Sequence, residues 1–228
     1  MTIRRLKACL NGGRTEPFVP STPAQIAAAA VSAVAAGAEA IHVHPRADDG
    51  RESLSPDDVA AAVTAARTAG VPVGVTTGRW IAPSNRHDLI AAWTTLPDFA
   101  SVNVSEPGYD DLVALLRAKG VQVEAGVWSA DEADRVGQVD RILVEIIDTP
   151  AADALSKADA ILARLTPSKA PILLHGEDEA CWPLIAHAGR LGLPTRIGLE
   201  DTLTGPRGEP VTSNADLVRL AIEVWDNR

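Results

Sequence analysis

Residues 40–66 read AIHVHPRADDGRESLSPDDVAAAVTAA, and this stretch shows the pattern on which the fold depends. The short apolar run at Ala40–His44 predicts a strand, and the alanine-rich residues that follow predict a helix. Ser55-Pro56-Asp57-Asp58 is typical of a helix start, because serine can cap the first turn and proline fits within it. The stretch therefore predicts one strand–loop–helix unit.

The same unit recurs along the chain. Eight short runs predict strands: Leu6–Leu10, Ala40–His44, Pro72–Thr76, Phe99–Val104, Val121–Val127, Arg141–Ile147, Pro171–His175 and Thr195–Leu199. A helical pattern follows each run. Two further helix starts read as capping boxes, Thr22-Pro23-Ala24-Gln25 and Ser129-Ala130-Asp131-Glu132. Helices are expected to stop at Gly37, Gly70, Gly120 and Gly192.

Eight such units without a linker predict one domain over residues 1–228, a compact (β/α)8 TIM barrel with short loops. The alternative is a doubly wound open sheet. That fold commonly carries a Gly-x-Gly-x-x-Gly turn after its first strand, and residues 10–17, LNGGRTEP, do not fit this motif. We therefore expect the barrel.

Composition excludes several classes of function. The chain has 228 residues, is 46% hydrophobic and carries a formal net charge of -9, which argues against nucleic-acid and anionic-membrane partners. No window approaches the roughly 20 apolar residues of a membrane span, and the apolar part of the N-terminus is too short for a signal peptide. Cys9 and Cys181 are the only cysteines, as in a reduced compartment. We expect a soluble cytoplasmic protein.

His42 and His44 are the first candidate metal ligands. Side chains on a strand alternate between faces, so both histidines point into the lumen, at the carboxyl end of the second strand. A carboxylate after the eighth strand, Glu200 or Asp201, would reach the same rim, because only the first strand lies between. Two imidazoles and a carboxylate suit zinc or a similar divalent ion. The alternative is a hydrogen-bonded histidine pair at a strand end.

Other polar residues are expected at the same rim, although each alone is a weak signal. They are Asn11, Thr76, Thr77, Ser101, Asn103, Ser105, Glu124, Glu145, Asp148 and His175. His87 and His187 fall in helical patterns, so we interpret them as structural or surface residues.

Several of these motifs together resemble the β-keto acid cleavage enzymes. The resemblance is carried by AIHVHPR, by TTG after the third strand, by FASVNVSEPG and VEAGVW at the fourth and fifth, and above all by RIGLEDTLTGPRGEPVTSNADLV at the end. It covers nearly the whole chain in order. It implies a zinc-dependent barrel in which a β-keto acid and acetyl-CoA give a new acyl-CoA and acetoacetate, a retro-Claisen reaction.

The resemblance also implies roles for individual residues. His42, His44 and Glu200 match the ligands of one zinc ion per chain. Asp201 matches the catalytic base and Arg196 the arginine paired with it. Thr77, Asn103 and Glu124 fall in motifs near the substrate. Family members tend to form tetramers, so a homo-oligomer is expected.

The turn after the first strand departs from the family pattern. Members that act on amino-bearing substrates tend to have an acidic residue near here, whereas this chain has Asn11, two glycines and Arg14. We therefore predict that Asn11 and Arg14 contact the distal end of the substrate and favour a neutral or anionic tail.

Strand parity raises one difficulty for the proposed roles. It places Arg196 and Glu200 on one face and Asp201 on the other, with roughly 13 Å of strand from Arg196 to Glu200. The chain must turn near Asp201 for the three to meet.

Two other functions remain open. A metal-dependent hydrolase on the same fold would typically carry histidines on the fifth and sixth strands, where this chain has Glu124 and Glu145. A non-catalytic relative that binds a small acid would not need Arg196, Glu200 and Asp201 together.

Overall fold

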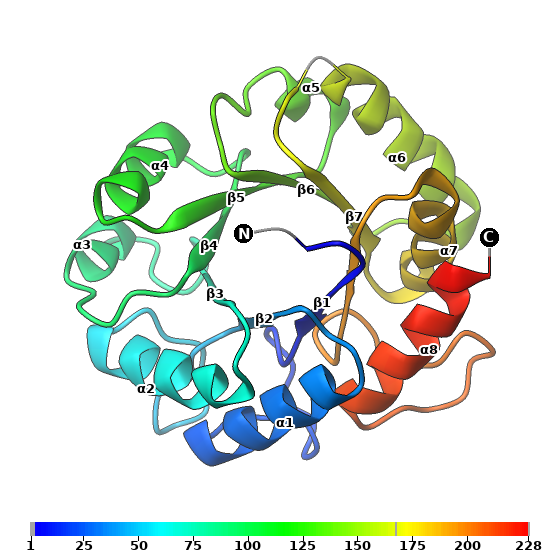
Figure 1. Cartoon of the computed structure of the whole chain (residues 1–228). Coiled ribbons are helices and arrows are strands. Elements are labelled where there is room, and N and C mark those ends of the chain that lie inside the picture. Colours follow the sequence, from blue (N-terminus) through cyan, green and yellow to red (C-terminus); the bar gives the residue numbers. More distant parts are fainter. Residues whose placement is uncertain (1–2, 167, 228) are drawn as a thin grey trace.

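Eight parallel strands and an outer ring of helices form a (β/α)8 barrel, as the sequence predicts (Figure 1). The computed structural model describes residues 3–166 and 168–227. The strands are β1 (Leu6–Cys9), β2 (Ala40–Val43), β3 (Val73–Thr76), β4 (Phe99–Asn103), β5 (Gln122–Val127), β6 (Arg141–Ile146), β7 (Ile172–Gly176) and β8 (Thr195–Ile197). The helices are α1 (Pro23–Ala35), α2 (Pro56–Ala66), α3 (Arg86–Ala91), α4 (Tyr109–Ala118), α5 (Ala130–Ala133), α6 (Ala151–Leu165), α7 (Cys181–Leu191) and α8 (Asn214–Asp226), with 3-10 turns η1 (Arg67–Ala69) and η2 (Asp178–Ala180).

Neighbouring strands pair in the order β7-β6-β5-β4-β3-β2-β1-β8. Two hydrogen bonds bridge the remaining seam between β7 and β8: Leu174 N donates to Pro194 O at 3.0 Å, and Thr195 Oγ1 donates to Leu174 O at 2.7 Å. The sheet is thus nearly closed. Because all strands run the same way, their carboxyl ends meet at one rim, where barrel enzymes place their chemistry.

Several strands stop short of the expected ends, for local reasons. β2 ends at Val43, because the His44 N–H donates to the Asn11 Oδ1 at 2.8 Å rather than to a neighbouring strand. β8 ends at Ile197, beyond which Gly198 presses against β1. A Cβ on Gly198 would lie only 1.7 Å from the Cys9 carbonyl oxygen, so only glycine fits this approach.

The expected helix starts are partly confirmed. Thr22 and Gln25 form a full capping box, and Ser55 Oγ accepts from the Asp58 N–H. The box predicted at Ser129 is wrong, because the Ser129 side chain caps nothing and Glu132 Oε2 instead accepts from the Trp128 N–H at 2.7 Å. The four expected stop glycines all have positive φ: Gly37, Gly70, Gly120 and Gly192.

Two apolar layers hold the barrel. The larger core fills the space between strands and helices, and a small cluster plugs the lumen. The plug consists of Ile3, Ala40, Phe99, Leu143 and Leu173. Ala40 and Phe99 are the first residues of their strands, so the plug closes the amino-terminal end of the lumen and leaves the carboxyl end for polar side chains.

A buried ion cluster lies on this plug. The Glu124 carboxylate pairs with the Lys7 ammonium and, at 3.1 Å, with Arg141 Nε. Both cations lie over the Phe99 ring, Lys7 Nζ at 5.5 Å and Arg141 Cζ at 5.3 Å from its centroid. The Phe99 ring and the three charged side chains therefore occupy the interior of the lumen.

Candidate metal centre and active-site cavity

The two histidines of β2 and the first carboxylate after β8 converge at the rim. His42 and His44 are almost fully buried, and both present Nε2 to the Glu200 carboxylate. His42 Nε2 lies 3.8 Å from Glu200 Oε2, and His44 Nε2 lies 3.5 Å from Glu200 Oε1. The expectation that the eighth and second strands bring these residues together agrees with the structure.

These three side chains fit a divalent metal ion. One ligand atom from each lies within 4.8 Å of the others, and no other group of this kind occurs in the described residues. Glu200 Oε2 is buried and has no hydrogen-bond partner there, so it is free to serve as a ligand. Two imidazole nitrogens and one carboxylate oxygen, with room for further ligands, are typical of catalytic zinc and similar ions.

The electrostatics of the cluster favour an ionised Glu200. Burial acts to raise its pKa, but Arg196 and the two histidines hold the pKa of Glu200 well below its usual value. Burial lowers the pKa of His42 well below 6.5. Burial would also lower the pKa of His44, yet the carboxylates of Glu200 and Glu52 outweigh it and raise it to about 9.

A turn after β8 brings Arg196 and Asp201 together and removes the difficulty that strand parity raised. The Asp201 N–H donates to Gly198 O at 2.9 Å, which reverses the chain. Arg196 then donates to both neighbouring carboxylates: Nη2 to Glu200 Oε1 at 2.6 Å, and Nε to Asp201 Oδ1 at 3.0 Å. Burial raises the pKa of Asp201, against the opposing effect of Arg196.

The two environments thus move the pKa values of two adjacent carboxyl groups in opposite directions. Glu200 is held as a carboxylate beside the histidines, whereas Asp201 has a raised pKa and an Oδ2 atom without a partner among the described residues. Such a pair is typical of sites in which one group binds charge and the other exchanges a proton. Asp201 is fully buried behind Arg196 and does not itself line the cavity.

His175 and Glu145 extend this network across β6 and β7. His175 Nε2 lies 3.0 Å from Glu145 Oε2, and His175 Nδ1 lies 3.7 Å from Asp201 Oδ1. Glu145 also accepts a hydrogen bond from Trp128 Nε1 at 3.2 Å. The rim residue Glu145 therefore connects the open cavity to the buried Asp201 through one imidazole.

A cavity of about 420 Å³ lies over the candidate metal centre. That volume is enough for a small organic acid. Gly126 keeps it open from below, since a Cβ there would lie 2.4 Å from Glu145 Oε1 and 2.5 Å from Asn103 Oδ1. Its side-chain lining comes from every strand end except that of β1, whose following turn contributes instead: Arg14, His42, His44, Thr76, Trp80, Ser101, Asn103, Trp128, Glu145, Ile147, Glu177, Asp178, Arg196 and Glu200.

Only two of the five predicted substrate-contacting residues line this cavity, Arg14 and Asn103. The Arg14 guanidinium pairs with Asp178 at 2.7 Å, and Asn103 Nδ2 donates to Glu106 at 3.1 Å. Both side chains therefore stand at the rim with fixed orientations.

The other three are held elsewhere. The Asn11 amide donates to Pro20 O and His44 O, so it ties the turns after β1 and β2 together. Thr77 Oγ1 donates to Ser101 O at 2.6 Å. Glu124 is one side-chain layer below the cavity in its ion cluster. These contacts hold the rim in place, and none of the three side chains lines the cavity.

Sequence reasoning missed four residues near the centre. Glu52 contacts His44, the indoles of Trp80 and Trp128 line the cavity, and Glu177 follows directly after the end of β7. Burial raises the pKa of Glu177 to about 8, although Arg196 opposes this. The two tryptophans each follow a predicted strand, which is a usable signal; Glu52 lies eight residues from His44 in a loop, and nothing in the pattern marks it.

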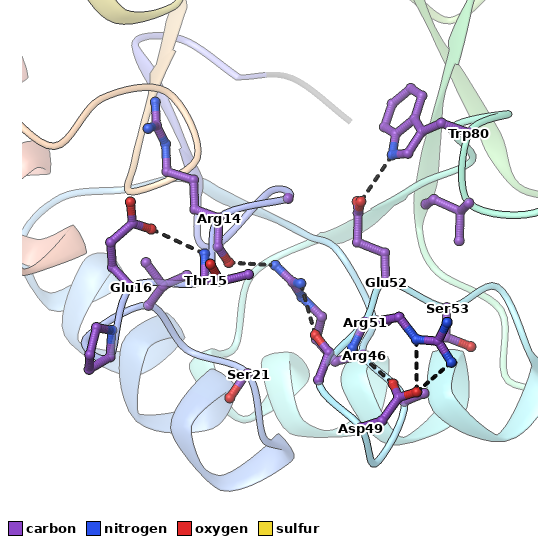
Figure 2. A pocket seen from close by; sticks show the side chains of 16 residues that line it. Arg14, Thr15, Glu16, Ser21, Arg46, Asp49, Arg51, Glu52, Ser53 and Trp80 are labelled. Atoms are coloured by element: carbon purple, nitrogen blue, oxygen red, sulfur yellow. Dashed lines mark hydrogen bonds and ion pairs between the residues drawn. The ribbon is translucent and has the colours of Figure 1, made fainter.

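A second, larger hollow of about 870 Å³ adjoins the cavity. It lies between the loops after β1, β2 and β3, and shares Gly13, Arg14 and Trp80 with the cavity (Figure 2). We call it the side groove. Arg46 joins the loops after β1 and β2 in this groove, because it donates hydrogen bonds to the carbonyl oxygens of Gly50, Gly12 and Arg14.

Fold and site together define a (β/α)8 barrel with a candidate His–His–Glu metal centre at its catalytic rim. The model of the β-keto acid cleavage enzyme family matches residues 6–227. The chain therefore belongs to this family, as the motifs at its strand ends predict. Among curated proteins, none has a sequence that matches this chain.

Solved structures of other enzymes share the fold at low sequence identity. The 3-dehydroquinate dehydratase from Geobacillus kaustophilus superposes with a TM-score of 0.63 at 12% identity, covering 99% of this chain and 93% of that one. The homocysteine methyltransferase MmuM from Escherichia coli gives 0.59 at 14% identity, covering 96% and 95%. Such likenesses show the barrel alone. Within the described residues, no helix is both long and apolar enough to cross a membrane.

Proposed function

We propose that this protein is a zinc-dependent β-keto acid cleavage enzyme that transfers the acyl group to coenzyme A. A β-keto acid, R–CO–CH2–COO⁻, and acetyl-CoA would give R–CO–CoA and acetoacetate. The observation that carries the proposal is the His42, His44 and Glu200 cluster beside the Arg196–Asp201 pair. Family membership supports β-keto acid cleavage in general.

His42, His44 and Glu200 would hold one zinc ion. When bound, that ion would act as a Lewis acid toward the keto oxygen and the carboxylate of the substrate. The ionised state of Glu200, which Arg196 maintains, is the state a ligand needs.

Arg196 is the residue best placed to receive the substrate's carboxylate. It lines the cavity and already faces Glu145 at 3.7 Å and Glu177 at 4.0 Å, besides its bonds to Glu200 and Asp201. A carboxylate that enters the cavity would compete for the same guanidinium.

Asp201 would act as the general base. It would accept the initiating proton on Oδ2, the atom without a partner in the described structure. Its raised pKa suits a proton acceptor, and Arg196 orients the carboxylate through Oδ1. Trp128 and Ser101, which line the cavity, would form part of the wall around the reacting carbons.

Arg14 and Asn103 would meet the distal end of the substrate. Arg14 comes from the turn after β1, and its guanidinium favours a neutral or anionic tail. The side groove would take acetyl-CoA, because it opens into the cavity beside Arg14 and Trp80. A homo-oligomer, as in the family, belongs to this proposal.

Two other functions are less well supported. A hydrolase of the amidohydrolase type would place metal-binding histidines on β5 and β6, and those strands carry Glu124 and Glu145 instead. A non-catalytic acid-binding protein would have no use for two carboxyl groups whose pKa values are driven apart.

One assay separates all three functions. Purified protein is incubated with a panel of β-keto acids, with and without acetyl-CoA, and with and without a chelator. Formation of acetoacetate that needs both acetyl-CoA and the metal supports the proposal. Product formation without acetyl-CoA would indicate a hydrolase, and ligand binding without turnover would indicate a binding protein.

A further inference from the structure

We propose that Glu52 is a positioning residue of the metal centre, which holds the His44 imidazole with Nε2 directed at the metal and is itself held by Trp80. This inference deepens the proposed function, because it rests on His44 being a metal ligand. It concerns a residue from a loop that carries no recognisable metal-binding motif.

The two ring nitrogens of His44 face two different carboxylates. Nδ1 lies 2.5 Å from Glu52 Oε1, and Nε2 lies 3.5 Å from Glu200 Oε1. A histidine binds a metal ion as the neutral imidazole, which carries one proton. When Nδ1 donates that proton to Glu52, the lone pair is left on Nε2, the nitrogen that faces the proposed metal position.

The second oxygen of Glu52 is also bound. Trp80 Nε1 donates to Glu52 Oε2 at 3.0 Å (Figure 2). The Trp80 ring also stacks on His44, with centroids 6.5 Å apart and planes 29° from parallel. Gly78 makes room for this indole, because a Cβ there would lie 2.3 Å from Trp80 Cη2. Two contacts thus hold the His44 ring: the hydrogen bond from its Nδ1 edge to Glu52 and the stacking of Trp80 on its face.

A hairpin after β2 brings Glu52 back to His44. Arg46 and Glu52 form an antiparallel bridge, and Ala47 N donates to Arg51 O at 2.9 Å. Ser53 N donates to Pro45 O at the same distance. The backbone hydrogen bonds of this hairpin therefore hold Glu52 in place, so that its carboxylate can orient the His44 imidazole.

His42 provides a comparison within the same site. Its Nδ1 is buried and has no hydrogen-bond partner among the described residues. Glu52 therefore acts on only one of the two imidazoles. Its removal should weaken the metal centre and not abolish it, and loss of such an outer partner typically costs 10–100-fold in metal affinity.

The test is zinc affinity, measured by competition with a chromophoric chelator, in the full chain and in Glu52→Ala, Glu52→Gln and Glu16→Ala. The Glu16 side chain lines the same side groove, and within the described residues its carboxylate accepts a hydrogen bond only from the neighbouring Thr15 N–H. We expect about a 10–100-fold loss for Glu52→Ala, a smaller loss for Glu52→Gln, which keeps an acceptor, and no change for Glu16→Ala.

The visible absorption of the cobalt-substituted protein gives a second readout. It reports the geometry around the ion, which Glu52→Ala should alter and Glu16→Ala should leave unchanged. Unaltered affinity and spectrum in Glu52→Ala would overturn the inference while leaving the metal centre intact. Failure of the unmodified protein to bind zinc or cobalt would overturn the metal centre and the inference together.

Discussion

Replacement of Glu124 by glutamine should destabilise the barrel and leave the chemistry at the rim intact. Glu124 is fully buried, and its carboxylate is the shared partner of Lys7 and Arg141. The neutral amide would leave two cations in the lumen above Phe99 without a counter-charge. Breaking a buried pair in this way typically costs about 3–5 kcal/mol.

The pKa of Glu124 gives a similar magnitude. Burial acts to raise it, but Lys7 and Arg141 outweigh burial and lower it from 4.5 to about 2. A shift of that size corresponds to about 3 kcal/mol, at 1.36 kcal/mol per pKa unit. Because the folded pKa is lowered, this stability is present above pH 4.5 and is lost as the pH falls toward 2.

The assay is thermal unfolding of both proteins at several pH values. At pH 7, a loss of about 3 kcal/mol should lower the unfolding temperature of Glu124→Gln by roughly 6–12 °C, at about 2–4 °C per kcal/mol for a chain of this size. The difference should shrink below pH 4.5. Glu223→Gln, an exposed change on α8, is the control and should have no effect. Equal unfolding temperatures with a raised KM for the β-keto acid would refute the reasoning, since Glu124 would then contact substrate.

Two further changes test the rim. Asp201→Asn keeps the shape and removes the base, so kcat should fall by about 10²–10⁴ while zinc content is retained; Glu200→Gln should instead lose zinc, and the opposite pattern would exchange the two roles. Arg14→Glu should lose activity on neutral and anionic β-keto acids and gain relative activity on cationic ones. An unchanged substrate ranking would remove Arg14 from the pocket.

Much of the fold is predictable because each unit of the barrel is local. An apolar run such as Ala40–His44 and a helix start such as Thr22 need no distant partner to be recognised, and both agree with the structure. The capping box predicted at Ser129 is wrong because such a box also needs a helix long enough to be capped, and α5 has only four residues.

The candidate site likewise contains residues that the sequence could place and residues that it could not. His42, His44 and Glu200 could be placed because strand parity and strand order determine which side chains share a rim. Glu52 could not, because a hairpin after β2 brings it back to His44.

Strand alternation correctly places the Glu124 side chain in the lumen. It does not show how far along the barrel axis that side chain lies, and therefore whether it reaches the cavity. Its partner Lys7 lies within an apolar run, so nothing in the sequence indicated a counter-charge below the cavity. Asn11 and Thr77 follow strands as active-site residues do, yet their side chains donate hydrogen bonds to backbone carbonyl oxygens.

The central claim is the metal centre, and metal content tests it most directly. The purified protein is dialysed against trace zinc and its metal content is measured by elemental analysis, beside the His42→Ala/His44→Ala double variant. We predict one zinc per chain in the unmodified protein and none above background in the variant, with β-keto acid cleavage lost in parallel. Equal zinc content in both proteins would contradict the account, because the metal would then lie elsewhere than between His42, His44 and Glu200.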